Sequence, residues 1–145
     1  MSQYKVTLLL GSNLNDPKEN IDKAISLIEM RLGKIFAKSK YLYSNPVEFV
    51  SFNIFCNIAM SITTQLSPIE LLKRIKTIER EMGRELDSKA HGEYKDRVID
   101  IDIVDFDHLN FECQKLTIPH KKHIKERDFS KELLINLKIS EKHRL

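Results

Sequence analysis

The sequence has few of the residues that form phosphate-binding loops or disulfide frameworks. Its 145 residues include four glycines, four prolines, two cysteines and no tryptophan. The glycines, at positions 11, 33, 83 and 92, lie too far apart for a GxxxxGK[ST] or GxGxxG pattern. Any nucleotide that binds this chain must therefore be held by side chains and metal ions rather than by a glycine-rich loop.

Disulfides, a zinc centre and a membrane span are also not expected. Cys56 and Cys113 lie in neither a CxxC nor a Cys/His metal-ligand spacing. The longest apolar stretch, Leu8 to Leu10 extended through Val6, has only the length of a strand. The N-terminus has no basic segment followed by a long apolar run. We therefore expect a cytoplasmic protein with no membrane partner.

The composition predicts one globular domain that spans residues 1–145. Apolar residues make up 41% and charged residues 31% of the chain, which differs from the apolar-poor composition of disordered proteins. The net charge of +3 is a small surplus of 24 basic over 21 acidic residues. Nucleic-acid binding usually requires a concentrated basic face. We expect a phosphorylated small molecule, not a nucleic acid, as the partner.

Helical and strand patterns alternate along the chain. Asp16-Pro17 and Ser67-Pro68, each followed by a glutamate in the first turn, are helix starts. The patterns predict helices over 16–33, 67–83 and 132–137, and strands or extended segments over 4–10, 35–43, 54–62, 98–106 and 116–119. These elements suggest an α+β fold in which helices pack on a mainly antiparallel sheet.

Asp100 and Asp102 are the most informative candidate site residues. In a strand, the two-residue period places both carboxylates on one face, while Ile99, Ile101 and Ile103 face the core. Two such carboxylates can bind Mg²⁺, which prefers oxygen ligands and is often shared with substrate phosphates. A surface strand with two solvated aspartates is the alternative, and the motif alone leaves both interpretations open.

The polar stretch over 84–97 favours the metal interpretation. It contains Arg84 and Arg97 together with two lysines and a histidine, and it leads directly into the acidic strand. Cations beside metal ligands are what phosphoryl-type transfer requires. A solvated polar loop is the alternative.

Glu79 and His120 carry weaker signals. Glu79 could orient a cation or a nucleotide hydroxyl, or pair with Lys76 or Arg80, and its spacing favours an exposed helix face. His120 follows Pro119 after a short apolar run, and a single histidine has many structural explanations.

Five segments taken together resemble one family. They are Gly11-Ser12-Asn13-Leu14, Phe55-Cys56-Asn57, the stretch EREMGR over 79–84, the stretch RVIDID over 97–102, and Leu116-Thr117-Ile118-Pro119-His120. Their order and sequence are similar to those of the 6-hydroxymethyl-7,8-dihydropterin pyrophosphokinases of folate biosynthesis, over about residues 4 to 129. The resemblance implies a ferredoxin-like fold with a six-stranded sheet core, and transfer of pyrophosphate from Mg-ATP to the pterin hydroxymethyl group, which leaves AMP.

The resemblance also implies roles for individual residues. Asp100 and Asp102 would bind two Mg²⁺ ions, Asp100 would also lie near the pterin hydroxyl, and Arg84 and Arg97 would be catalytic. The pterin would contact Asn45, Pro46, Val47, Phe55, Asn57, Asp100 and Phe129. The nucleotide would contact Glu79, Arg84, Arg97, Lys115, Thr117, His120, Lys121 and Arg127. We expect a monomer whose partners are ATP and hydroxymethyldihydropterin.

The sequence departs from the family pattern before the acidic strand. Many members have Arg-Trp-Gly-Pro-Arg there, whereas this chain has Glu93-Tyr94-Lys95-Asp96-Arg97. This departure keeps open a non-catalytic pterin or nucleotide binder. A ferredoxin-like nucleic-acid-binding module is a third interpretation, although carboxylates on the exposed strand face would repel phosphates.

Overall fold

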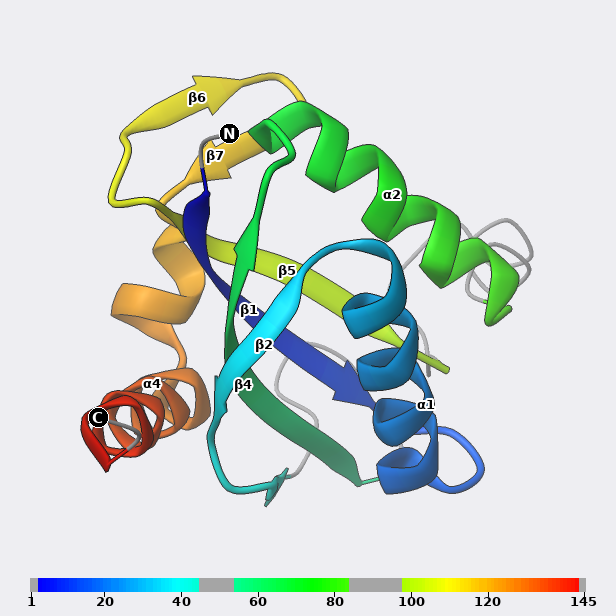
Figure 1. Ribbon diagram of the computed structural model, residues 1–145. Helices are drawn as coiled ribbons and strands as arrows, with labels where there is room; N and C mark the ends of the chain where they lie inside the picture. Colours follow the sequence, from blue (N-terminus) through cyan, green and yellow to red (C-terminus); the bar gives the residue numbers. More distant parts are fainter. Residues whose placement is uncertain (1–2, 45–53, 84–97, 144–145) are drawn as a thin grey trace.

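The computed structural model describes residues 3–44, 54–83 and 98–143. Their elements, in chain order, are β1 (Tyr4–Ser12), α1 (Pro17–Arg31), β2 (Lys34–Lys38), β3 (Leu42–Ser44), β4 (Phe55–Thr64), α2 (Pro68–Glu81), β5 (Asp100–Phe106), β6 (Phe111–Cys113), β7 (Leu116–Ile118), the short π-helical turn η1 (Lys122–Glu126) and α4 (Asp128–His143). Figure 1 shows the long strands crossing the centre of the molecule, with helices on either side.

The described strands form one antiparallel sheet of five strands and a separate two-stranded hairpin. The long strands follow the order β2-β4-β1-β5, and β3 also pairs with β4. β1 and β4 are the two central strands, and together with α1, α2 and β5 they give the ferredoxin-like α+β fold that the sequence predicts. The expected six-stranded core is not found among the described residues, because β6 and β7 pair only with each other.

α1 and α2 cover one face of the sheet. Both helices begin as the sequence predicts: the Asp16 and Ser67 side chains accept hydrogen bonds from the backbone N–H groups of Glu19 and Glu70. Alternate residues of the long strands face these helices and make the main core; they include Leu8, Leu10, Cys56, Ile58, Met60, Ile101 and Ile103. The strand predicted over 54–62 is therefore confirmed as β4, with alternate side chains facing the helices.

α4 covers only part of the opposite face. Leu133 and Leu137 of this helix pack on Leu9, Ala59 and Val104 of the central strands. The described helices leave the rest of that face open, and it is the face on which Asp100 and Asp102 lie. One side of the sheet thus serves as core along its whole length, while the other side is divided between α4 and a cleft.

Several element boundaries differ from the prediction. β1 continues two residues beyond Leu10, the segment 35–43 divides into β2 and β3, and β5 begins at Asp100 rather than at Val98. The last helix is sixteen residues long instead of six, because its exposed face also carries apolar residues and hides the period. No helix among the described residues is both long and apolar enough to span a membrane.

Candidate active site

β5 presents its two carboxylates to the open face of the sheet. Ile101 and Ile103 are buried beneath α1 and α2, while Asp100 and Asp102 are partly exposed on the other side. The backbone N–H of Ile101 donates a hydrogen bond to the buried carboxylate of Glu79, with 2.8 Å between the nitrogen and Oε2. The predicted orientation of the acidic strand is therefore confirmed.

A cleft of about 550 Å³ lies above this open face. It brings together most of the site residues that the sequence predicts and that the structure describes. These lining residues are Phe55, Asn57, Asp100, Asp102, Lys115, Thr117, His120, Lys121, Arg127 and Phe129. Asn45, Pro46, Val47, Arg84 and Arg97 lie outside the described residues.

Gly11 links the two strands that carry the acidic and amide groups. It pairs with Asn57 of β4 on one side and with Asp100 of β5 on the other. A Cβ atom at position 11 would lie 2.5 Å from Asn57 Oδ1, so the absence of a side chain lets the amide lie across β1. Asn57 and Asp100 therefore lie at the same level of the sheet, with one strand between them.

The basic wall of the cleft comes from the segment that follows β5. The β6–β7 hairpin supplies Thr117, and Lys115 lies in its turn. His120, Lys121 and Arg127 follow the hairpin and also line the cleft. Several cationic side chains thus share one cleft with two carboxylates, which suits a ligand made of phosphates and cations.

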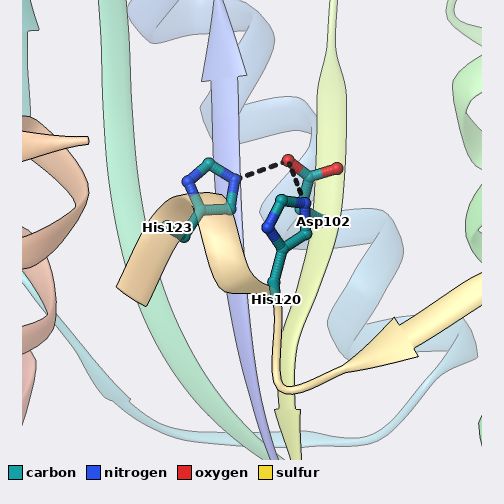
Figure 2. Close-up of side chains that lie close together, drawn as sticks. All are labelled: Asp102, His120 and His123. Atoms are coloured by element: carbon teal, nitrogen blue, oxygen red, sulfur yellow. Dashed lines mark hydrogen bonds and ion pairs between the residues drawn. The ribbon is translucent and has the colours of Figure 1, made fainter. Parts of the chain in front are cut away.

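A buried histidine is hydrogen-bonded to one of the carboxylates. His123 Nε2 lies 2.7 Å from Asp102 Oδ2 (Figure 2). On the other side of the ring, His123 Nδ1 lies 2.6 Å from Ser130 Oγ. An ionised carboxylate can only accept, so Nε2 must carry a proton, and in the neutral ring Nδ1 accepts from the Ser130 hydroxyl. His120 Nε2 lies 4.0 Å from the same oxygen, and the two imidazole centroids are 4.2 Å apart.

The charges around Asp102 keep it ionised. Burial alone would raise the pKa of the Asp102 carboxyl, but the hydrogen bond from His123 and the nearby positive charges outweigh burial and lower it below the ordinary 3.8. Burial, followed by the charge of His123, lowers the pKa of His120 below the ordinary 6.5. At neutral pH the pair therefore combines a charged carboxylate with a neutral His120 ring.

Glu79 lies away from the exposed helix face that its spacing favours. It is 2% exposed on α2, its Oε1 lies 3.3 Å from Lys76 Nζ, and Oε2 accepts from the Ile101 N–H. The expectation of an exposed face is wrong because the backbone of β5 supplies a buried partner. Among the described residues, Lys76 of α2 lines the cleft, whereas Glu79 does not.

Sequence reasoning missed His123 and Ser130. The only local signal is the three-residue spacing between His120 and His123, which places both rings on one side of a helical turn. Ser130 gives no signal, because its partner His123 lies seven residues away across the turn η1 and the start of α4.

Comparisons with known proteins agree on one family. The model of the family described as 7,8-dihydro-6-hydroxymethylpterin-pyrophosphokinase (HPPK) matches residues 7–139. The chain is 34% identical over 125 residues to the 2-amino-4-hydroxy-6-hydroxymethyldihydropteridine pyrophosphokinase of Porphyromonas gingivalis, and the match covers 86% of this chain and 84% of the relative. It is 32% identical over 114 residues to the protein of the same name from Bacillus subtilis, covering 78% and 66%.

A solved structure is similar in fold. The crystal structure of Plasmodium falciparum HPPK-DHPS with pteroate aligns with a TM-score of 0.58 and 17% identity, over 93% of this chain and 33% of that one. At this level of identity the likeness concerns the fold alone, and it agrees with the ferredoxin-like arrangement described above.

Proposed function

The chain belongs to the 7,8-dihydro-6-hydroxymethylpterin-pyrophosphokinase family, and from this premise we propose how its cleft binds the substrates and promotes pyrophosphoryl transfer. The protein is an ATP-dependent pterin pyrophosphokinase of folate biosynthesis, which transfers a pyrophosphoryl group from ATP to 6-hydroxymethyl-7,8-dihydropterin and releases AMP. The observation that carries the proposal is the common cleft shared by the Asp100–Asp102 pair, the basic wall and the amide of Asn57.

Asp100 and Asp102 suit the magnesium ions of Mg-ATP. Both provide hard oxygen ligands on one face of a rigid strand. One oxygen of Asp102 accepts from His123, while its other oxygen points away from both imidazole rings (Figure 2). When bound, the two ions would supply charge neutralisation at the phosphate oxygens. We therefore assign both aspartates as magnesium ligands.

The basic wall would hold the nucleotide. Lys115, Lys121 and Arg127 place positive charge along one side of the cleft, and Thr117 and His120 offer hydrogen bonds to phosphate or ribose oxygens. We assign the adenosine and phosphates to these residues. Arg84 and Arg97 complete this set in the proposal, on the basis of their sequence positions.

The aromatic side chains of the cleft and the amide of Asn57 would take the pterin. Phe55 and Phe129 line the cleft and offer aromatic surfaces on which a flat bicycle can stack. The amide of Asn57 offers both a donor and an acceptor to the polar edge of the pterin. We also assign Asn45 to Val47 to the pterin, on the basis of their sequence positions. Asp100 lies at the same level of the sheet as Asn57, with β1 between them, which supports its assignment to the hydroxymethyl end of the pterin.

The reaction needs positioning more than a strong base. Phosphoryl-type transition states carry their charge mainly on the transferred oxygens, so fixed cations and aligned substrates provide most of the acceleration. Asp100 is the carboxylate that we assign to receive the hydroxyl proton. His120, whose ring is neutral at neutral pH, would contribute a hydrogen bond rather than a positive charge.

The test is formation of AMP by the purified protein with Mg-ATP and hydroxymethyldihydropterin. We expect Asp100→Asn and Asp102→Asn each to lower kcat by about 10²–10³-fold, the typical loss when one electrostatic stabiliser is removed. Asp105→Asn is the matched control, because Asp105 lies on the same strand but pairs with the exposed His108.

Two results would contradict the proposal. Equal activity of Asp105→Asn and Asp102→Asn would show that the cleft carboxylates have no special role. Tight binding of an ATP analogue and pterin without any AMP at high enzyme concentration would show a binding protein that has lost catalysis.

A further inference from the structure

Asp102, His120 and His123 form a cluster in which the pyrophosphokinase reaction gives His123 no role of its own. The ligand atoms of these three residues all lie within 4.8 Å of one another. Figure 2 shows both imidazole rings turned toward the same carboxylate oxygen. We propose that the three side chains bind a divalent transition-metal ion of the Zn²⁺ or Co²⁺ type, at a site that shares Asp102 with the magnesium ligands.

The distances in the cluster are close to those of a metal centre. Donor atoms around a tetrahedral ion lie about 3.3 Å apart when each is about 2.0–2.2 Å from the metal. Here Asp102 Oδ2 lies 2.7 Å from His123 Nε2 and 4.0 Å from His120 Nε2. Small rotations of the carboxylate and of the His120 ring would bring all three atoms onto one ion.

The surrounding structure holds each ligand in place. Asp102 is fixed by the pairing of β5 with β1. The backbone N–H of His120 donates to the Val104 carbonyl at 2.9 Å, which ties this histidine to the strand of Asp102. His120 Nδ1 is buried and has no hydrogen-bond partner among the described residues, so within this part of the chain no hydrogen bond at Nδ1 holds the ring away from an ion.

Ser130 gives His123 the outer partner that metal-binding histidines usually have. His123 is buried, and its Nδ1 lies 2.6 Å from the Ser130 hydroxyl, which is itself buried. A hydroxyl can accept as well as donate, so the ring can carry its proton on Nδ1 and offer the Nε2 lone pair to a metal. The hydrogen bond to Asp102 would then be replaced by two bonds to the ion.

The ligand types determine which ion the site prefers. Two imidazoles and one carboxylate favour Zn²⁺, Co²⁺ or Ni²⁺, whereas Mg²⁺ prefers oxygen ligands. Three protein ligands leave further positions of the ion for water or a phosphate from the cleft, which all three residues line. Because Asp102 serves both ions, excess Mg²⁺ should weaken binding of the transition metal.

The experiment is a titration of metal-free, tag-free protein with Co²⁺ in the absence of nucleotide, followed by visible absorption. We expect one equivalent to bind with the spectrum of a low-coordinate, nitrogen-ligated ion. His120→Ala and His123→Gln should lose this spectrum, because each lacks one imidazole. Ser130→Ala should bind about 10-fold more weakly, as expected for loss of an outer partner.

His108→Ala is the matched control. His108 also lies beside a carboxylate, with its Nδ1 3.2 Å from Asp105 Oδ2, but this exposed pair has no third ligand among the described residues. It should leave the Co²⁺ spectrum unchanged. His123→Gln retains a donor for Asp102 in a side chain of similar reach, and His120→Ala alters a partly exposed residue, so circular dichroism should show both variants folded.

The inference is overturned if the unaltered protein gives no nitrogen-ligated Co²⁺ spectrum. It is equally overturned if His120→Ala and His123→Gln bind Co²⁺ as tightly as the unaltered protein, or if His108→Ala weakens binding as much as they do. These outcomes are distinct from failure of the pyrophosphokinase proposal, because AMP formation is measured with Mg²⁺ alone.

Discussion

Glu79 stabilises the strand that carries both cleft carboxylates, and its removal should measurably weaken the fold. Its carboxylate is 2% exposed and accepts the Ile101 N–H at 2.8 Å, between Asp100 and Asp102. β5 is the last strand in the order β2-β4-β1-β5, so no described strand pairs with this side of it. Glu79→Ala would therefore leave the Ile101 N–H buried without its acceptor.

The size of the effect follows from this contact. A hydrogen bond to a charged group contributes about 1.5–3 kcal/mol, and an unsatisfied buried donor costs about 1–3 kcal/mol. Both ranges describe the loss of the same hydrogen bond and are not added, so we expect Glu79→Ala to lower the free energy of unfolding by about 2–3 kcal/mol. For a domain of this length that corresponds to a Tm about 7–10 °C lower. Glu79→Gln keeps an acceptor oxygen and should cost about 1 kcal/mol.

Urea denaturation followed by circular dichroism measures the effect. Glu81→Ala on the same helix is the matched control, since Glu81 pairs with Arg31 at 2.7 Å on the exposed surface. Such a surface pair contributes little to stability, because solvent and salt screen the two charges. If Glu79→Ala were no less stable than Glu81→Ala, the assignment of Glu79 as the acceptor that secures β5 would be refuted.

Three further predictions concern other contacts. Gly11→Ala places a Cβ 2.5 Å from Asn57 Oδ1, so we expect KM for the pterin to rise about 10-fold with little change in KM for ATP; an equal rise for both would contradict this. In Gly33→Ala the new Cβ would lie 1.9 Å from the Thr63 carbonyl oxygen, and thermal unfolding should show a loss of about 1–3 kcal/mol; an unchanged Tm would exclude the clash. The Tyr41 hydroxyl donates a hydrogen bond to Asp22 and lowers the pKa of that carboxyl below 3.8. The stabilisation from this hydrogen bond is present at neutral pH and is lost as the pH falls through the lowered pKa. Tyr41→Phe should therefore be less stable than the unaltered protein at pH 7, with the difference shrinking below about pH 4; a difference independent of pH would refute the link.

The sequence predicted the parts of the fold that depend on local periodicity. The helix starts at Asp16 and Ser67 were readable because capping chemistry is local. The two faces of β4 and β5 were readable because side chains alternate along any strand. The family resemblance added a list of site residues, most of whose described members line one cleft.

Contacts between distant segments could not be read in this way. Glu79 lies beside the apolar stripe of α2 and resembles a surface residue until β5 presents its backbone N–H. His123 is only one of five histidines in the sequence, and its burial results from the turn η1 and the approach of α4. The extended segment predicted over 116–119 contains β7, but its partner β6 was missed because a strand of three residues is too short for a reliable period.

The position of β5 at the end of the described sheet also bears on solubility. A strand in that position can pair with a strand of another molecule, and charged side chains on it are one of the common protections against such association. Asp100 and Asp102 add two negative charges to this strand, and Glu79 occupies one of its backbone donors. Variants that neutralise the aspartates should therefore be checked for aggregation before a loss of turnover is attributed to chemistry.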